Sequence, residues 1–592
     1  MSDKIDFKES YEKTIKFLSK KKVQNTIAII LLIAILVFGV WIRVQPLPNL
    51  IDKTTGEYTP LALDPYYFLR ISQTLMETGG HLPEIDSMRY GGLNPGWSKE
   101  ILPKTTVGLY KIIHAFSKEA TLRFADVLNP VIFFALGLLI FFFFIWFLTK
   151  NKWIAIVSSF ILTIVPPYLY RTLAGFSDHE AIGMVGVFLA LLLFTWGLFL
   201  LDKKSKPLNL GIVGFIAGFS TMFAIAAWGG GAKFLFMIFP LAFLIRWLVR
   251  RKDSLRKNIS FYGLWIVGIF VGALFFGYAL SGVLRSYMLN FSGILTLVSL
   301  IYIIVEGVLR KTETLNDKTK KYQKLISLLI TIVIGAIFYQ IAVGNVFSMI
   351  GHMLKSIIYP FGTARVSLTV AENAQPYLND LIAQIGKVFY YIFLVGSLIV
   401  GWRVSQGIRK KSFRSLFTIS FAIFLLGILY SRISSSSALN GNNGLSKAFF
   451  FISFLIFAVS TIYIYSRSDW KIETKWIIII AWMIPMLLSV RSAIRVFFAL
   501  MPFMSFMVAS AIFETGKIAK KSKDETTRIL LWIVFALMII GIIYISAGHY
   551  KTVSYQAKNQ HPSYNPDWQN AMSWVRGNTL EGEIFLHWWD YG

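Results

Sequence analysis

Long apolar runs separated by short polar and basic segments make up most of the chain. The first run, about 26–44, has the roughly 20 residues that a helix needs to span a bilayer. A lysine-rich segment precedes it and no small-residue cleavage site follows, so we expect a retained first helix with residues 1–25 in the cytoplasm. Further runs lie near 128–148, 152–170, 181–201, 209–228, 231–249, 259–281, 286–308, 324–345, 386–402, 413–430, 447–466, 475–490, 495–513 and 528–547. The pattern predicts an all-α polytopic membrane protein with 13 to 15 transmembrane helices over 26–548.

Basic residues fall in alternate loops between these runs, as they do in membrane proteins whose cytoplasmic loops are rich in Lys and Arg. The basic loops are KNK at 150, DKKSK at 202, RRKDSLRK at 250, RKTETLNDKTKKYQK at 310, RKKSFR at 409 and the lysines from 517 to 523. The opposite face then receives loops at about 45–126, 171–180 and 346–385, together with the C-terminal segment. We therefore expect a multi-pass protein of the cell membrane whose chemistry takes place on the extracytoplasmic face.

The composition removes several classes of function. The chain is 55% hydrophobic with a net charge of +28, but nearly all aromatic residues lie inside apolar runs rather than among the basic residues. Nucleic-acid binding is therefore not expected. The chain has no cysteine, which excludes disulfides, zinc-thiolate sites and cysteine nucleophiles. Any metal ion must be held by oxygen or imidazole ligands.

Acidic residues are scarce, and those in the outer loops are candidates for chemistry. Asp64, in LALDPYYFLR, suits the start of an amphipathic helix at the interface, or a plain helix cap. Asp178 and Glu180, in FSDHEAIG, could reach one hard cation from a non-helical turn, or could cap a helix. Glu372, in TVAENAQP, follows an extended-looking stretch and could simply be solvated. Their common face favours a shared metal site that takes Mn²⁺ or Mg²⁺.

Two further segments on this face suggest ligand contacts. Arg491 and Arg495, in SVRSAIRVFF, lie at the outer edge of two abutting apolar runs, where a guanidinium either extends to the headgroups or binds an anionic phosphate. The WGGG segment at Trp228 either brings backbone close to a ligand or forms a tight turn. The C-terminal segment 549–592 has helical periodicity in its middle and strand character before WWDYG. It predicts the start of a mixed α/β extracytoplasmic domain.

The motif WWDYG at Trp588 to Gly592, following many apolar runs, resembles the signature of the catalytic subunit of asparagine-linked oligosaccharyltransferase. Asp64, the Asp178-His179-Glu180 motif, TVAE ending at Glu372 and Arg495 in IRVFFAL match that family's other motifs in the same order. The resemblance covers essentially the whole chain and looks archaeal. Family members have 13 spans and continue well past this motif, so we expect this chain to be a fragment.

The resemblance implies a fold of the GT-C glycosyltransferase type and a set of roles. The enzyme would transfer a glycan from a dolichyl phosphate or diphosphate carrier to asparagine in Asn-X-Ser/Thr, with inversion at the anomeric carbon, as a single subunit. Asp64 and Glu372 would be catalytic, and Asp64, Asp178 and Glu180 would hold the metal ion, with His179 as a further ligand or a partner of one. Arg495 and Trp228 would bind the lipid phosphate. Trp588, Trp589 and Asp590 would bind the acceptor sequon.

Other classes of membrane protein remain as alternatives. A different polyprenyl-phosphate sugar transferase, such as a protein O-mannosyltransferase, shares the many spans and the first-loop acidic motif but has no need of WWDYG. A transporter usually places ionisable groups in the middle of its spans, whereas these acids lie in the outer loops. A purely structural scaffold would not need three acidic loops on one face.

Overall fold

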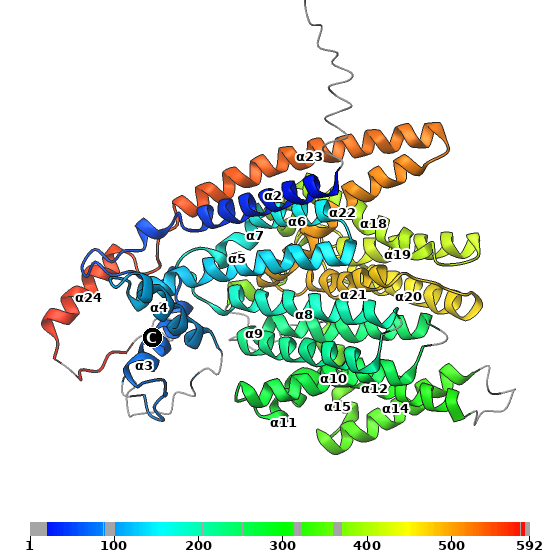
Figure 1. Cartoon of the computed structure of the whole chain (residues 1–592), viewed down its shortest axis with the longest axis horizontal. Coiled ribbons are helices and arrows are strands. Elements are labelled where there is room, and N and C mark those ends of the chain that lie inside the picture. Colours follow the sequence, from blue (N-terminus) through cyan, green and yellow to red (C-terminus); the bar gives the residue numbers. More distant parts are fainter. Residues whose placement is uncertain are drawn as a thin grey trace, which may run out of the picture.

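The computed structural model describes residues 20–86, 88, 97, 101–203, 205–250, 253–312, 319, 322–358, 370–580 and 582–586. Long helices lie side by side along the longest axis of the molecule (Figure 1). The first half contains α2 (Lys21–Arg43), η1 (Leu47–Asn49), α3 (Asp64–Glu77), α4 (Leu102–Phe116), α5 (Leu122–Thr149), α6 (Lys152–Ile164), α7 (Pro166–Leu169), η2 (Tyr170–Thr172), α8 (His179–Leu201), α9 (Pro207–Val249), α10 (Leu255–Phe275), α11 (Leu280–Val283) and η3 (Leu284–Met288). The second half contains α12 (Leu295–Thr312), α14 (Gln323–Ala342), α15 (Val346–Ile358), η4 (Ala371–Asn373), α17 (Leu378–Ile385), α18 (Lys387–Ser405), α19 (Lys411–Tyr430), α20 (Gly444–Arg467), α21 (Thr474–Ser489), η5 (Ile494–Val496), α22 (Phe497–Lys521), α23 (Glu525–Lys558) and α24 (Pro566–Asn578).

Eleven helices in the described part of the chain are long and apolar enough to cross a membrane, or up to 12 if the bent pair over 152–172 is one span. This confirms a multi-pass helical protein but not the predicted 13 to 15 spans. The predicted run at 475–490 is α21, whose 16 residues fall short of the roughly 20 that a span needs. The run at 286–308 is interrupted, and its second part, α12, contains Glu306, Arg310 and Lys311 within 18 residues.

The 43 residues of α9 form two arms that run in opposite directions. The backbone leaves the helical conformation at Trp228, with φ −156° and ψ 87°. In the first arm, Gly214 lies against Phe261 and Gly218 against Trp265, so this arm runs parallel to α10. In the second arm, Phe239 contacts Trp265 and Phe243 contacts Tyr262, which is the antiparallel order. The two predicted runs at 209–228 and 231–249 are therefore the two arms of α9.

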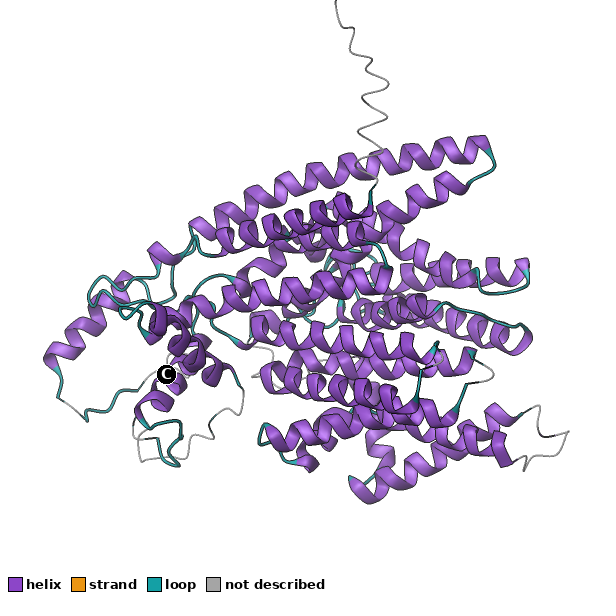
Figure 2. Cartoon of the chain, in the orientation of Figure 1, coloured by secondary structure: helices purple, strands orange, loops and turns teal. Residues whose placement is uncertain are grey.

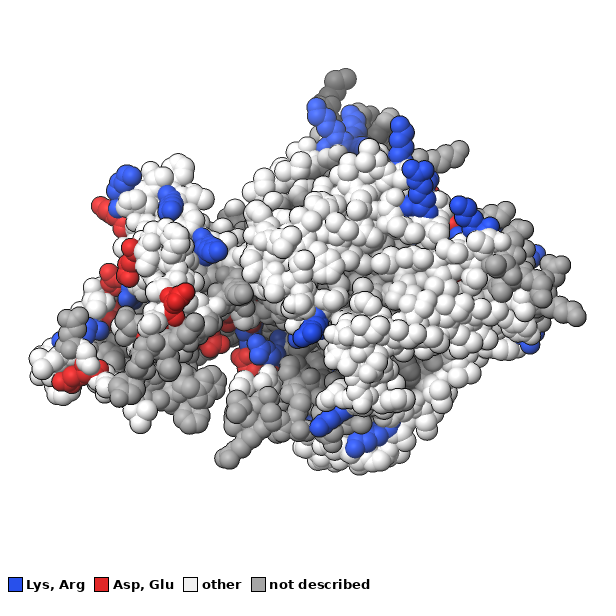
Figure 3. Space-filling model, turned by 90° about the horizontal axis from the view of Figure 1, so that it is seen from below, with Lys and Arg blue, Asp and Glu red and all other residues white. Residues whose placement is uncertain are grey.

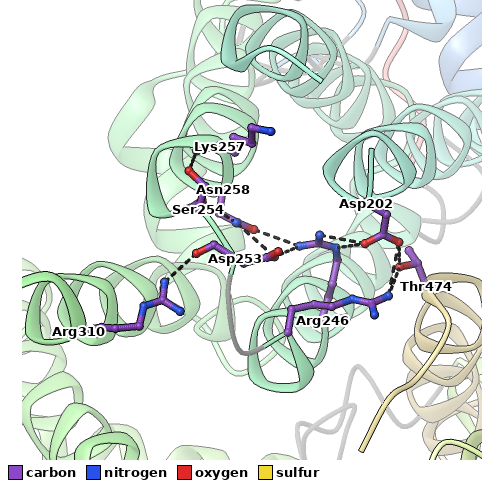
Figure 4. Close-up of polar contacts among 9 residues, drawn as sticks. Asp202, Arg246, Asp253, Ser254, Lys257, Asn258, Arg310 and Thr474 are labelled. Carbon is purple, nitrogen blue, oxygen red and sulfur yellow. Dashed lines mark hydrogen bonds and ion pairs between the residues drawn. The ribbon is translucent and has the colours of Figure 1, made fainter. Parts of the chain in front are cut away.

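A network of charged residues fixes the end of the bundle at which α8 finishes, which we call the basic end. The side chain of Arg246 is 1% exposed and lies between Asp202, after α8, and Asp253, before α10 (Figure 4). It donates to Asp202 Oδ1 at 3.0 Å and to Asn258 Oδ1 at 3.3 Å. Thr474 also donates to Asp202, and Arg310 Nη2 donates to the Asp253 carbonyl at 2.8 Å. These contacts join α8, α9, α10, α12 and α21, and they bring together three of the predicted basic loops.

The opposite end carries α3, α4 and α24 (Figure 1). From below, most of the visible acidic residues lie over this end, mixed with basic residues, and much of the remaining surface carries few charges (Figure 3). A surface with few charges fits the hydrocarbon layer of a membrane.

Helices and loops account for all the described residues, apart from isolated bridges such as Ile51 with Tyr58 (Figure 2). The predicted helix in the C-terminal segment is present as α24. The expected strand before WWDYG is not found in the described residues, which show no regular structure at 583–586. The mixed α/β domain is thus not confirmed, and Trp588, Trp589 and Asp590 lie outside the described residues.

Candidate active site

The loop that leads into α8 is shaped by close contact with the first outer loop. Gly175 adopts φ +84°, and a Cβ at this position would lie 2.6 Å from Leu50 Cδ1 and 3.1 Å from the Leu61 nitrogen. Glycine is needed here for both its conformation and its size. The Leu61 N–H donates to the Gly175 carbonyl at 2.8 Å, and the Gly175 N–H donates to the Val127 carbonyl at 2.8 Å. The chain is therefore held firmly just before Asp178.

Asp178 is the N-cap of α8, and Glu180 lies in its first turn. The Asp178 carboxylate accepts the His179 backbone N–H at 2.7 Å. Burial raises the pKa of Asp178, but hydrogen bonds from His179 and its charge outweigh burial and lower that pKa below the usual value. The capping interpretation and the metal interpretation are thus compatible. Because Asp178 precedes the helix, the two carboxylates escape the divergence that D-x-E has within a helix.

Asp178, His179 and Glu180 each offer one ligand atom, and these atoms lie within 4.8 Å of one another. Asp178 Oδ1 is 2.8 Å from His179 Nδ1, and His179 Nε2 is 3.9 Å from Glu180 Oε1. Both carboxylates are buried, and Glu180 Oε2 has no hydrogen-bond partner among the described residues. Two carboxylates and an imidazole are a donor set for Mn²⁺, Mg²⁺ or Zn²⁺. The residues therefore fit a divalent cation.

Arg171 is the residue that the sequence analysis missed. Its guanidinium bridges two carboxylates, with Nη1 on Glu180 and Nη2 on Glu372. It also lies over the Phe176 ring, 5.4 Å from the centroid. Arg171 thereby ties η4, which carries Glu372, to the start of α8. The available signal was an arginine seven residues before Asp178 in an otherwise apolar segment, because a buried cation requires an anion.

Asp64 is placed beside this cluster rather than within it. It begins α3, with proline at the next position, as the sequence predicted. Phe68 of the same helix meets the His179 ring edge-on at 6.1 Å and 90°, and it packs with Ile182 and Ala227. The Asp64 side chain is exposed and is not a member of the group of ligand atoms within 4.8 Å. The structure thus brings the helix of Asp64 against the His179 ring of the cluster.

Arg495 and Trp228 approach the cluster from other helices. Arg495 lies in η5 and is close enough to Glu180 to interact electrostatically. The Ile494 N–H donates to the Ala374 carbonyl at 3.1 Å, so η5 lies against the segment that carries Glu372. The Trp228 ring stacks on His179 at 6.1 Å and 24°. The site thus combines three carboxylates, an imidazole and two arginines from distant parts of the chain.

Comparison with known proteins agrees with this helical membrane architecture. The model of the family described as oligosaccharyl transferase STT3, N-terminal, matches residues 26–371. That match covers more than half of the chain, and the chain belongs to this family.

One curated relative and two solved structures are distant in sequence but match nearly the whole chain. Dolichyl-phosphooligosaccharide-protein glycotransferase 1 of Pyrococcus horikoshii is 23% identical over 610 residues, covering 99% of this chain and 52% of the relative. The chain thus spans about half the length of this curated relative.

The archaeal oligosaccharyltransferase AglB from Archaeoglobus fulgidus, in complex with an inhibitory peptide and a dolichol-phosphate, aligns with a TM-score of 0.62 at 15% identity. The alignment covers 96% of this chain and 63% of AglB. A structure of the A. fulgidus enzyme with Zn and sulfate aligns at 0.58 and 15% identity, covering 95% and 60%. These structural likenesses establish the fold.

Proposed function

We propose that this chain is the membrane-embedded catalytic part of an oligosaccharyltransferase. It would transfer a glycan from a dolichyl phosphate or diphosphate carrier to the asparagine side chain of Asn-X-Ser/Thr in secreted proteins. The observation that carries the proposal is the bridge made by Arg171, which joins Glu372 to the Asp178, His179 and Glu180 cluster. The complex of A. fulgidus AglB with an inhibitory peptide and a dolichol-phosphate supports these substrate classes.

Asp178 and Glu180, with Asp64 from the neighbouring helix and His179 as a further donor, would hold Mn²⁺ or Mg²⁺ in this proposal. The buried oxygen of Glu180 that lacks a partner among the described residues supports this ligand set. When bound, the ion would neutralise charge on the departing lipid phosphate and orient the carboxylates. Zinc bound to the A. fulgidus enzyme supports a divalent cation site without selecting the metal.

In this proposal, the carboxylates activate the asparagine amide of the acceptor. An amide nitrogen is a poor nucleophile because its lone pair is delocalised into the carbonyl group. Carboxylates that accept hydrogen bonds from both amide N–H groups favour the rotated, more nucleophilic form, and we assign this role to Glu372 and Asp64. Arg171 keeps the Glu372 carboxylate facing the site, where its half-exposed position leaves it open to a substrate.

Arg495 is assigned to the donor, because its guanidinium lies near the buried cluster and can pair with a lipid phosphate. Attack by the amide from the face opposite that phosphate inverts the anomeric carbon. The Trp588, Trp589 and Asp590 segment is assigned to the Ser or Thr hydroxyl of the sequon. In this proposal, the reaction takes place on the extracytoplasmic face of the cell membrane and is carried out by a single subunit.

The test is transfer of a lipid-linked glycan to a fluorescent peptide by the full-length protein. Asn-X-Thr and Gln-X-Thr peptides are compared, with Mn²⁺ and after EDTA treatment, in the native sequence and in Asp64→Ala. We expect metal-dependent transfer to the asparagine peptide alone, with loss in Asp64→Ala. Transfer to Ser or Thr peptides without a sequon would overturn the proposal and favour another polyprenyl-phosphate sugar transferase.

A further inference from the structure

A groove of about 510 Å³ runs between the first arm of α9 and α10, away from the candidate active site. It is lined by Pro207, Gly211, Phe215, Arg256, Ser260 and Leu264, together with two neighbouring apolar residues. Leu208 and Ile212, which also line it, are well exposed, so the groove faces the surroundings of the bundle rather than its core. In a membrane protein, this surface faces hydrocarbon chains. The groove therefore has the apolar lining that suits a lipid tail.

One end of the groove is basic. The first arm of α9 and α10 run parallel, so both helices begin at the basic end of the bundle. Arg256 lines the groove in the first turn of α10, and Lys206 immediately precedes α9. Both side chains are exposed. Helix N-termini carry partial positive charge, which adds to these two cations.

The nearest acids do not neutralise this end of the groove. Asp202 and Asp253 both turn toward Arg246, and they lie within its hydrogen-bond network (Figure 4). Among the ion pairs of the described ranges, neither Arg256 nor Lys206 takes part. The groove thus combines an apolar lining with positive charge at its basic end.

We propose that this groove binds an anionic membrane lipid of the leaflet at the basic end. One hydrocarbon chain lies along Gly211, Phe215 and Leu264, and the headgroup phosphate pairs with Arg256 and Lys206. The absent Cβ of Gly211 keeps the floor open, since it would lie 2.6 Å from Leu264 Cδ1. The site is distinct from the donor site, because α9 spans from one end of the bundle to the other before reaching Trp228.

Native mass spectrometry of the purified, delipidated protein tests this proposal. Phosphatidylglycerol and phosphatidylcholine with identical acyl chains are titrated, and the first bound lipid is quantified. We expect the native protein to bind phosphatidylglycerol several-fold more strongly. Arg256→Gln should abolish this preference, whereas Gly211→Leu should weaken binding of both lipids by filling the groove.

Lys411→Gln is the matched control, because Lys411 is an exposed cation that begins α19 and does not line the groove. This control should retain the preference for phosphatidylglycerol. Equal binding of the two lipids by the native protein would overturn the proposal. So would an unchanged preference in Arg256→Gln, or an equal loss in Lys411→Gln. Thermal stability in detergent verifies that each variant is folded, so a loss of lipid binding is not mistaken for unfolding.

Discussion

Two buried arginines stand at opposite ends of α8, and each bridges two carboxylates from distant elements. Arg246 joins Asp202 to Asp253, and Arg171 joins Glu180 to Glu372. The 23 residues of α8 separate the two clusters by roughly 34 Å. The two clusters differ in the residues that surround each arginine.

The Arg246 network is nearly saturated. Asn258 also accepts from Arg246, and Asp202 accepts a further hydrogen bond from Thr474. At the other end, the Glu372 side chain is 49% exposed, and one oxygen of the buried Glu180 has no hydrogen-bond partner among the described residues. A buried ion pair whose groups are nearly all satisfied fixes helices, whereas one with spare acceptors is arranged to take a ligand.

The largest change in stability should come from Arg246→Gln. Removal of this cation leaves two acids facing each other at a helix junction, and breaking a buried ion pair costs about 3–5 kcal/mol. We expect a clear drop in the thermal unfolding temperature in detergent, with nearly normal glycan transfer per folded molecule at low temperature. A variant that stays as stable as the native protein would show that the Arg246 network does not fix the helices.

Asp178→Asn should produce the largest loss of activity. The amide keeps the shape of the side chain but removes a buried negative charge from the proposed metal site. Transfer to an Asn-X-Thr peptide should fall at least about 100-fold, the size of effect seen when one charged or polar transition-state stabiliser is removed. Isothermal titration with Mn²⁺ should show weakened binding in parallel. Full activity with normal Mn²⁺ binding would contradict the site.

Arg171→Gln should lower activity by about 10- to 100-fold, the usual effect of losing a partner that orients a ligand. The expected loss is in kcat, because Glu372 would no longer be held toward the cluster. Arg403→Gln is the matched control, since Arg403 also pairs with a largely buried acid, Glu514, away from the site. Equal losses of transfer in the two variants would mean that Arg171 acts only through stability.

Glu372→Gln should separate activity from stability most cleanly. Its side chain is half exposed, so the unfolding temperature should change little. The neutral amide is a weaker acceptor than the carboxylate and has an NH₂ donor in place of one oxygen, so transfer should fall about 10-fold or more. Steady-state kinetics with increasing peptide will show whether kcat or KM carries the loss. An unchanged kcat would remove Glu372 from the chemistry.

The smallest effect is expected from Trp228→Phe. The smaller ring keeps an aromatic contact with His179 but covers less of it. Metal affinity should weaken a few-fold, measured by the EDTA concentration that halves transfer. A loss as large as that of Asp178→Asn would show that Trp228 touches a substrate directly.

Local sequence signals predicted much of this architecture. The Asp-Pro pair at Asp64 marks the start of α3, and the D-H-E motif marks the cluster at α8. What the sequence could not provide was long-range pairing: Arg171 and Glu372 are 201 residues apart, and no periodicity connects them. The reversal of α9 at Trp228, by contrast, falls between the two runs that hydropathy predicted at 209–228 and 231–249.

The hydrogen bond from the Ile494 N–H to the Ala374 carbonyl has a mechanical consequence. It links the turn that carries Arg495 to the segment that carries Glu372, so a displacement of either segment moves the other. The backbone that carries the group assigned to the donor is thereby tied to the backbone that carries the group assigned to the acceptor. One residue could be inserted between Glu372 and Ala374, or between Ile494 and Arg495. Either insertion would change the position of one side chain relative to the other while leaving both side chains intact.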